Sequence, residues 1–471
     1  MSEAKSNVTV EMTKNRKFLF LASVMVLAVG YNAASYGSTV VTPRLLTALD
    51  GMSYYPLNSS MGTLGMMLSL PIVGKLCDIF GSKAVPIFGV LLQIVGRLAM
   101  PYAMNVPVFM TFFALSSVGG GLFASAPFAL IADVVEPQER TKYYGMLVTF
   151  KAAGSLIGPL ITGILVDAGY IKTALLSYVP FAILSIPVIL AFYPNLKKNQ
   201  LAGTKFDYAG VTLLILSICC IILWISLGSK LFAWFSPISI ILLTVGVVSL
   251  ILLIRTENNH PNPAVALFVF KKKRCRTTFI CQFLSTAFAT CTASYLVVFM
   301  QREMMLSGTV SSTATMPQTI VQMVFAGVIG GYIGKNFKKL FRSTALISLA
   351  CTGAALFVYS ALKADSSLIM IYAAVAVGGL GTIVPQACFT TYFQEELKPG
   401  EMRAAQGMYS FCSSGGSVIF GAISGAILNA GFTYNTVFFM GGIFLVLSLI
   451  VGFIGLRFPE EKADTTAPAA G

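Results

Sequence analysis

Long apolar segments follow one another along almost the whole chain and are separated by short polar turns. Many of them are about 20 residues long, the length of a helix that crosses a hydrocarbon core of about 30 Å. They lack the alternation of polar and apolar residues that is typical of outer-membrane barrel strands. Because backbone polar groups must bond internally within a bilayer, the pattern predicts an all-α polytopic membrane protein.

We expect about fourteen membrane helices, at residues 18–40, 57–76, 84–103, 107–131, 143–166, 173–193, 209–228, 236–254, 277–299, 313–334, 343–362, 367–392, 405–428 and 437–457. Polar links follow the sixth and the eighth of these helices, and a polar tail rich in Ala and Pro, typical of disorder, ends the chain. The predicted organisation is a six-helix bundle in residues 1–195, two inserted helices with cytoplasmic links in 196–275, a second six-helix bundle in 276–458, and a disordered cytoplasmic tail in 459–471.

An internal repeat supports this partition. The segment 139–146 resembles the segment 401–408, which lies 262 positions later, and the same displacement relates 154–155 to 416–417. The fifth and thirteenth helices therefore correspond and enter the membrane in the same direction. This is the arrangement of parallel repeats that are related by an axis along the membrane normal.

Composition agrees with a membrane protein, because 56% of the residues are hydrophobic and only 11% are charged. The net charge is +14, but 25 of the 32 basic residues lie on one side of the expected membrane, among them those at the N-terminus and in the loops near 197–198, 271–274 and 335–342. This positive-inside bias predicts that both termini lie in the cytoplasm, and it argues against a nucleic-acid partner. We expect the protein in the plasma membrane. The basic run at 271–274 either sets the topology alone or also contacts anionic lipid headgroups.

The sequence has no phosphate loop of the form G-x-x-x-x-G-K-[ST], no H-E-x-x-H and no cluster of metal-ligating residues. We therefore expect no enzymatic activity, no catalytic residue, no metal site and no cofactor. The nine cysteines form no C-x-x-C pair and are expected to be free thiols.

The loop between the second and third helices carries a distinctive sequence. It resembles the loop signature of the major facilitator superfamily, G-x-L-a-D-r-x-G-r-k, at Gly74, Leu76, Asp78, Gly81 and Lys83. In that family the loop Asp pairs with groups near the fifth helix and latches one conformation. The resemblance implies gating roles for Gly74, Asp78, Gly81 and Arg140, with an exposed ion pair worth about 0–1 kcal/mol as the alternative reading of Asp78 and Arg140.

The fifth helix contains a second motif of this family. Residues 154–163 are similar to g-x-x-x-G-P-x-x-G-G, with Thr162 in place of one glycine. Small residues four positions apart let helices pack closely, and a proline can bend a helix. Gly154, Gly158, Pro159 and Gly163 are therefore predicted to take part in gating. With the helix count, these motifs resemble the fourteen-helix, drug:proton antiporter branch, which implies the major facilitator fold and transport by alternating access.

The sequence departs from this branch where proton coupling is concerned. The fourth helix of the branch often carries R-x-x-Q-G-x-G, whereas Leu115 and Val118 stand in place of the Arg and Gln here. Ala34 stands where the first helix usually carries an Asp. Coupling through the family's usual residues is therefore not expected, and protons or another ion stay open as the coupling partner.

Only two charged residues, Arg97 and Lys151, lie in the middle of an expected span. A charge at the bilayer centre costs roughly 2.5–3.5 kcal/mol, so each is a candidate for function. Lys151 lies near the midplane, because it follows the loop residue Lys142 by about 13 Å at ~1.5 Å per residue. It either binds an anionic solute, shuttles a proton or extends toward the cytoplasm. Arg97 is the weaker candidate, because it can extend to the outer face.

Uncharged polar residues can complete a substrate site: Asn32, Tyr36, Tyr295, Gln318 and Gln322. Each either binds solute or forms a hydrogen bond between helices. The sequence thus predicts a monomeric secondary active transporter of a small organic solute, anionic or amphiphilic. The alternatives are a proton-coupled multidrug efflux antiporter and a membrane receptor or partner subunit that transports nothing.

Overall fold

The computed structural model describes residues 13–51, 54–81, 83–124, 126–193, 207–227, 236–259, 265–306, 310–311, 313–398 and 401–458. Within these ranges the regular structure is entirely helical. Twelve helices are long and apolar enough to cross a membrane. The multi-pass, all-helical architecture expected from the hydropathy pattern is therefore confirmed.

The N-terminal half comprises the helices up to residue 192: α1 (Lys14–Ala48), α2 (Tyr55–Ser69), α3 (Val73–Phe80), α4 (Ala84–Ala99), η2 (Met100–Tyr102), α5 (Val106–Ala124), α6 (Ala126–Val134), α7 (Pro137–Asp167), α8 (Ile171–Leu176) and α9 (Val179–Phe192). Two further helices follow: α10 (Tyr208–Leu227) and α11 (Pro237–Asn259).

The C-terminal half comprises the remaining elements: η4 (Leu267–Lys271), α12 (Lys273–Thr290), η5 (Cys291–Leu296), α13 (Val297–Arg302), η6 (Thr313–Thr315), α15 (Met316–Lys335), α16 (Phe337–Ser360), α17 (Leu368–Gln394), α18 (Met402–Asn429) and α19 (Tyr434–Gly455). Of these, η5 is a π-helical turn that continues the helix from α12 into α13.

Two of the fourteen expected spans are not among the twelve. The predicted helix 57–76 is interrupted at residues 70–72, between α2 and α3. Pro71 lies in this turn and has no backbone N–H to continue the helical hydrogen bonds. The other span corresponds to α10, of which Ala209–Ile221 forms a shorter apolar helix. A count of fourteen therefore stays a prediction.

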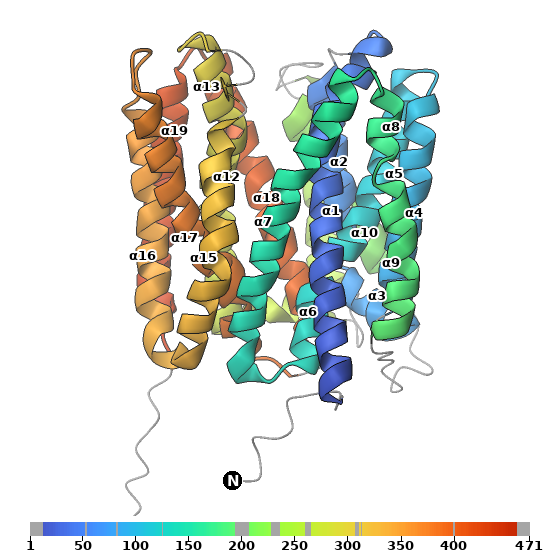
Figure 1. Ribbon diagram of the computed structural model, residues 1–471, viewed down its shortest axis with the longest axis vertical. Coiled ribbons are helices and arrows are strands. Elements are labelled where there is room, and N and C mark those ends of the chain that lie inside the picture. Colours follow the sequence, from blue (N-terminus) through green and yellow to red (C-terminus); the bar gives the residue numbers. More distant parts are fainter. Residues whose placement is uncertain are drawn as a thin grey trace, which may run out of the picture.

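The helices form two groups that stand side by side (Figure 1), with α7 and α18 lying between them. Along its length α7 packs against α1 of its own half and against α15 of the other. The pair α10–α11 packs together and contacts α2, α18 and η4. The described chain begins with α1 and ends after α19 at the same end of the molecule, the lower one in Figure 1.

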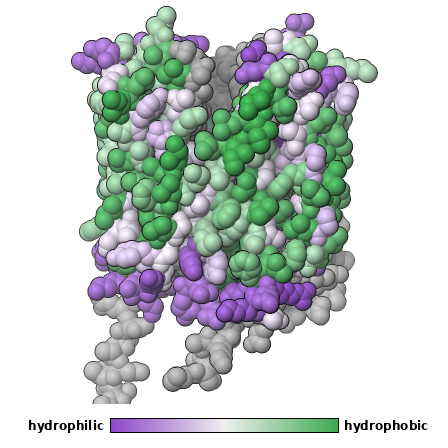
Figure 2. Space-filling view, viewed as in Figure 1, coloured by the Kyte–Doolittle hydropathy of each residue, from purple (hydrophilic) through white to green (hydrophobic). Residues whose placement is uncertain are grey.

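A hydrophilic band covers this lower end, and a broad hydrophobic belt lies above it (Figure 2). We call this lower end of the molecule the basic end and define it by Lys17, Lys142, Lys272 and Lys335. Here ion pairs join η4 and α12 to the segment between α17 and α18: Lys272 bonds Glu401, and Arg274 bonds Glu395. Burial raises the pKa of Glu395. Burial also acts to raise the pKa of Glu401, but hydrogen bonds from Lys272 and from the Lys398 N–H outweigh it and lower that pKa.

At the basic end the two halves pack closely against each other, and glycines at the contacts make this possible. A Cβ atom at Gly145 of α7 would lie 2.4 Å from the backbone oxygen of Ala326 on α15. A Cβ atom at Gly407 of α18 would lie 2.2 Å from the backbone oxygen of Leu70. Gly145 and Gly407 are 262 positions apart, the displacement of the internal repeat. The closed end is thus built from two equivalent contacts, one on each side of the molecule.

Candidate functional site

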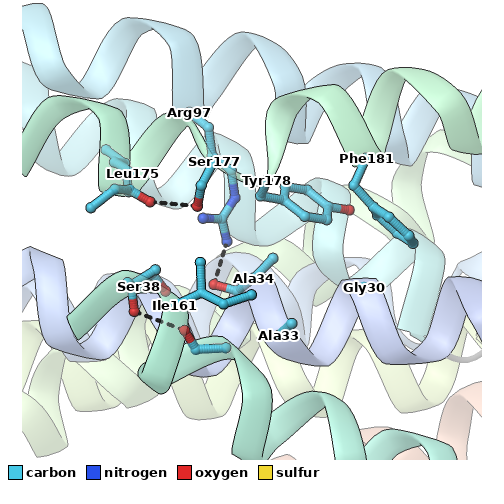
Figure 3. A pocket seen from close by; sticks show the side chains of 13 residues that line it. Gly30, Ala33, Ala34, Ser38, Arg97, Ile161, Leu175, Ser177, Tyr178 and Phe181 are labelled. Carbon is cyan, nitrogen blue, oxygen red and sulfur yellow. Dashed lines mark hydrogen bonds between the residues drawn. The ribbon is translucent and has the colours of Figure 1, made fainter. Parts of the chain in front are cut away.

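Arg97 extends from α4 into the interior of the N-terminal half (Figure 3). Its side chain is only 7% exposed, and its Nη2 donates a hydrogen bond to the backbone oxygen of Ala34, 3.2 Å away on α1. The guanidinium carbon lies 5.0 Å from the ring centre of Tyr178. The side chain therefore turns inward and does not extend to the membrane surface.

This cation is incompletely satisfied. Among the described residues, Nε of Arg97 has no hydrogen-bond partner, and no carboxylate lies within 4.0 Å of the guanidinium. Gln93 lies one helical turn earlier on α4; it is also buried, and its Nε2 has no partner in the same part of the chain. Buried polar groups are normally hydrogen-bonded, so two unused donors in one place point to a ligand that supplies acceptors.

Both side chains line a cavity of about 370 Å³, which we call the Arg97 cavity. Its walls come mainly from α1, α2, α4 and α5 of the N-terminal half, and Ser414 and Ser417 of α18 complete it from the C-terminal half. The remaining polar lining consists of hydroxyl groups: Tyr31, Ser35, Ser38, Thr63, Ser116 and Ser117. The cavity therefore offers a cation, an amide and several hydroxyls to one solute, and both halves contribute to it.

A second, smaller cavity of about 170 Å³ is also lined by Arg97 (Figure 3). It is enclosed by α1, α7, α8 and α9, and its wall includes Ser177, Tyr178 and Phe181. Arg97 and Ser38 line both cavities. The guanidinium thus separates two adjoining spaces within the N-terminal half.

Glycines bring α4 and α5 close enough to hold this arrangement. A Cβ atom at Gly119 would lie 2.3 Å from the backbone oxygen of Gly89, and one at Gly96 would lie 2.7 Å from that of Phe112. Larger residues at these positions would force the helices apart. The close approach is what places Ser116 of α5 beside Arg97 in the cavity wall.

Lys151, the cation favoured on sequence grounds, lies elsewhere. It is partly buried on α7, and its Nζ is 5.3 Å from the ring centre of Phe128 on α6. It lines neither cavity, and in the described part of the protein it has no hydrogen bond or ion pair. The structure therefore does not bring Lys151 and Arg97 into one site, and a solute-binding role for Lys151 stays a prediction.

The uncharged candidates are also dispersed. Asn32 is buried and donates to Ala28 of its own helix at 2.9 Å, while Tyr36 is 51% exposed. Tyr295 donates to the backbone oxygen of Gly421 on α18 at 2.8 Å. None of these three lines the two cavities. The bond of Tyr295 is the hydrogen bond between helices that we considered as the alternative to solute contact, whereas the bond of Asn32 lies within α1.

The glutamines on α15 have a similar setting. Gln322 donates to Thr382 of α17 at 2.6 Å, and Gln318 lies against Gly379 of the same helix. The residues that sequence reasoning missed are Gln93 and the cavity hydroxyls. Gln93 lies one helical turn before Arg97, and this spacing is the signal in the sequence that could have placed both on one face of α4.

The predicted gating residues fall into two groups, one at α3 (Gly74, Asp78 and Gly81) and one on α7 (Arg140, Gly154, Gly158, Pro159 and Gly163). At Gly74 a Cβ atom would lie 2.6 Å from Cα and N of Ala404 on α18, so this glycine permits a close contact between the halves. Gly81 ends α3 with φ of 97°, a conformation that favours glycine. The side chain of Asp78 lies outside the described part of the structure, so the predicted pairing with Arg140 stays a prediction.

Arg140 itself is only 2% exposed, so the alternative of an exposed ion pair does not describe it. Its Nε donates to the backbone oxygen of Val135 at 3.0 Å, and its Nη2 donates to that of Ala132 at 2.7 Å. Its Nη1 lies 3.8 Å from Sδ of Met402, which is the residue 262 positions later. Arg140 therefore joins the end of α6 to the C-terminal half.

Hydrogen bonds between the halves lie next to this arginine. Thr141 bonds Thr391 at 3.0 Å, and the hydroxyl of Tyr144 donates to Gln394 at 2.8 Å. All four groups are buried. Together with the glycine contacts, they close the basic end.

The glycine motif on α7 has two distinct environments. Cβ atoms at Gly154 and Gly158 would lie 2.2 and 2.1 Å from backbone oxygens of α1, whereas Gly163 has nothing within 4 Å. Pro159 lies inside α7, next to Gly158. The first two glycines therefore allow α1 and α7 to pack closely, and no such contact accounts for Gly163.

Known proteins resemble this chain in sequence and in fold. The family model described as Major Facilitator Superfamily matches residues 18–420 and 278–471. Multidrug resistance protein 3 of Bacillus subtilis (strain 168) is 25% identical over 91% of this chain and 82% of its own length. Multidrug transporter protein MdtP of the same organism is 23% identical over 88% of this chain and 76% of its own length.

Among solved structures, the human organic anion transporter MFSD10 (TETRAN) has the same fold, with a TM-score of 0.63. The match covers 94% of this chain and 100% of that one at 13% sequence identity. An identity this low shows the fold alone. With the family match along the chain and the twelve apolar spans, the conclusion is that this protein is a multi-pass membrane transporter that belongs to the major facilitator superfamily.

Proposed function

We propose that this protein is a secondary active transporter that moves a small organic, anionic or amphiphilic solute across the plasma membrane by alternating access. The observation that carries the proposal is Arg97, a buried cation with an unused donor, in a cavity lined by both halves. Because a buried charge is costly without a partner, an acceptor group on the solute is the expected complement.

The cavity suits such a solute. A carboxylate or sulfonate can accept hydrogen bonds from Arg97 and Gln93, and bonds between ionised groups are the stronger ones. Met66, Phe113 and Leu175 supply apolar surface for the rest of the molecule. No carboxylate occurs among the described residues that line the two cavities, so nothing there complements a cation as Arg97 complements an anion.

The positive-inside bias assigns the basic end to the cytoplasm. In this orientation the conformation described here is closed toward the cytoplasm, through Gly145, Gly407 and the Tyr144–Gln394 hydrogen bond. Separation of these contacts would open the cavity toward the cytoplasm. The two bundles of the sequence partition would then be the parts that rock, with α10 and α11 as the inserted pair.

The test is a thermal-shift assay of the purified transporter with two probes of equal shape and opposite charge, 1-naphthylacetate and (1-naphthylmethyl)trimethylammonium. A ligand at a hundred times its dissociation constant stabilises the folded state by about 2.7 kcal/mol. We expect the anion to raise the melting temperature of the wild type and of Lys151→Gln, and to lose this effect in Arg97→Gln. Lys142→Gln, at the basic end, is the control for loss of one positive charge.

Gln93→Leu is a second variant, which leaves the arginine in place. It should weaken the effect of the anion without abolishing it. Stabilisation by the cation alone, unchanged in Arg97→Gln, would overturn the proposal. Loss of the anion effect in Lys151→Gln but not in Arg97→Gln would move the binding site to α7.

A second candidate is proton-coupled efflux of several drugs, and the names of the Bacillus subtilis relatives favour it. Transport of a cationic drug into proteoliposomes, abolished by an uncoupler, would support this function over the first. A third, a receptor or partner subunit without transport, predicts binding but no counterflow of solute in the same vesicles.

A further inference from the structure

A third cavity, of about 340 Å³, lies apart from the Arg97 cavity, between α10 and α11 on one side and α2, α12 and α18 on the other. We call it the inserted-pair cavity. Its lining is apolar except for Ser217, whose hydroxyl bonds the backbone oxygen of Leu214 in its own helix. Water in this space would find almost no polar partner, so the cavity suits an apolar occupant.

The cavity opens toward the bilayer. Ile254 of α11 and Ile419 of α18 line it and are 43% and 37% exposed, so its mouth lies on the outer surface of the bundle. Leu253 and Leu214, also in the lining, are 2% and 3% exposed and form its floor. The hydrocarbon region of the membrane is therefore continuous with its interior.

Positive charges follow the lining residues toward the basic end. Ile254 is followed by Arg255, and Phe270 of η4 is followed by Lys271; both cations are exposed. The neighbouring cations are engaged, since Lys272 bonds Glu401 and Arg274 bonds Glu395. Arg255 and Lys271 have no ion pair among the described residues. Two cations that remain available to an anion thus directly follow lining residues of the cavity in the sequence.

We propose that the inserted-pair cavity binds one acyl chain of an anionic phospholipid from the leaflet at the basic end, with Arg255 and Lys271 holding its phosphate. Charge complementarity selects this occupant, because an apolar chain that carries an anionic head at one end matches both parts of the site. This site is separate from the transported solute and does not depend on the chemistry of the Arg97 cavity.

The position of the cavity gives the lipid a role in stability. Met67 of α2 and Met408 of α18 both line it, and these helices belong to different halves. A chain packed between them adds contacts across the halves at the seam that α10 and α11 cover. Bound lipid should therefore stabilise the conformation that is closed at the basic end.

Native mass spectrometry of the purified protein tests the proposal, with palmitoyl-oleoyl-phosphatidylglycerol and the matching phosphatidylcholine as probes. Gly415→Leu fills the cavity, because a Cβ atom there would meet only Cε of Met67, 3.5 Å away. Gly425→Leu on the same helix is the matched control, since nothing lies within 4 Å of that position and it is not part of the cavity. Arg255→Gln with Lys271→Gln removes the phosphate contacts, and Lys335→Gln with Lys339→Gln is the charge-matched control.

We expect tighter binding of phosphatidylglycerol than of phosphatidylcholine, at least tenfold weaker binding in Gly415→Leu, and about fivefold weaker binding for each cation removed from the Arg255 and Lys271 pair. Both control variants should bind as the wild type does. Equal binding of the two lipids, or wild-type binding in either test variant, would overturn the proposal. Displacement of the lipid by 1-naphthylacetate would also overturn it, because the cavity would then belong to the solute. Gel-filtration profiles and circular dichroism establish that each variant is folded.

Discussion

Gly74 offers a direct way to shift the balance between conformations. Alanine at this position would place its Cβ atom 2.6 Å from Cα and N of Ala404 and 3.0 Å from the carbonyl carbon of Arg403. These are backbone atoms of α18, so no side chain can rotate away. Ordinary contact begins at 3.4 Å, and α3 and α18 must therefore separate by about 0.8 Å. The variant Gly74→Ala should disfavour the conformation in which the two halves meet here.

The size of the effect follows from the cost of overpacking, which is typically about 1–3 kcal/mol. The strain exists only while the basic end is closed, so the closed conformation loses this free energy relative to the open one. A differential of about 1–3 kcal/mol changes the ratio of the two conformations by roughly 5- to 150-fold. Gly407→Ala should act in the same direction, because its Cβ atom would lie 2.2 Å from the backbone oxygen of Leu70.

Pulsed electron paramagnetic resonance can measure the ratio with spin labels at Gln138 and Lys339, which are exposed on the two halves at the basic end. We expect a second, longer distance to gain population in Gly74→Ala. Gly425→Ala, with nothing within 4 Å, is the control and should retain the wild-type distribution. An unchanged distribution in Gly74→Ala together with a lower melting temperature would refute the reasoning, because α3 alone would then have absorbed the strain.

Three further predictions concern single contacts. Gly158→Ala should lower the melting temperature, because its Cβ atom would lie 2.1 Å from an oxygen of α1, whereas Gly163→Ala, in open space, should leave it unchanged or raise it slightly. Tyr144→Phe removes a buried hydrogen bond between the halves, worth about 1 kcal/mol, and should increase the open population about fivefold in the same resonance measurement. The pKa of Glu401 is lowered in the folded protein, so its pair with Lys272 contributes stability above the ordinary pKa of 4.5, and this contribution is lost as pH falls through the lowered pKa. Thermal unfolding between pH 3 and 7 should show a smaller acid-side loss in Glu401→Gln, by at most about 1 kcal/mol.

The sequence was sufficient for the helices, because twenty-residue apolar segments have few structures open to them in a bilayer. The sequence was insufficient for the candidate site, because the direction of each side chain decides whether it lines a cavity. The depth of Lys151 followed from the helical rise, but the face of α7 that it occupies depends on which helices surround α7. On sequence grounds Arg97 could either bind solute or extend to the outer face, and the close packing of α4 on α5 through Gly89 and Gly119 places it in a cavity wall. Contacts between segments distant in the sequence determine where the side chains of Lys151 and Arg97 lie, and no local sequence pattern encodes these contacts.

The same limit applies within a single motif. Gly158 and Gly163 belong to one family pattern, yet only Gly158 meets another backbone. The break at residues 70–72 had a local signal in Pro71, and the apolar pattern across it concealed the interruption. Motif spacing thus identified the right helix, while the structure separates the positions that pack from those that do not.

The location of the Arg97 cavity explains how a solute can act on the balance between conformations. A ligand shifts an equilibrium only when its affinity differs between the two states. Arg97 and Gln93 belong to the N-terminal half, whereas Ser414 and Ser417 belong to α18 of the other half. The same helix carries Gly407 and Ala404, the contacts that close the basic end. In the proposed alternating-access cycle α18 would move away from α3, the two serines would leave the cavity wall, and a solute bound there would lose part of its contacts. Binding and closure would therefore be linked through one helix.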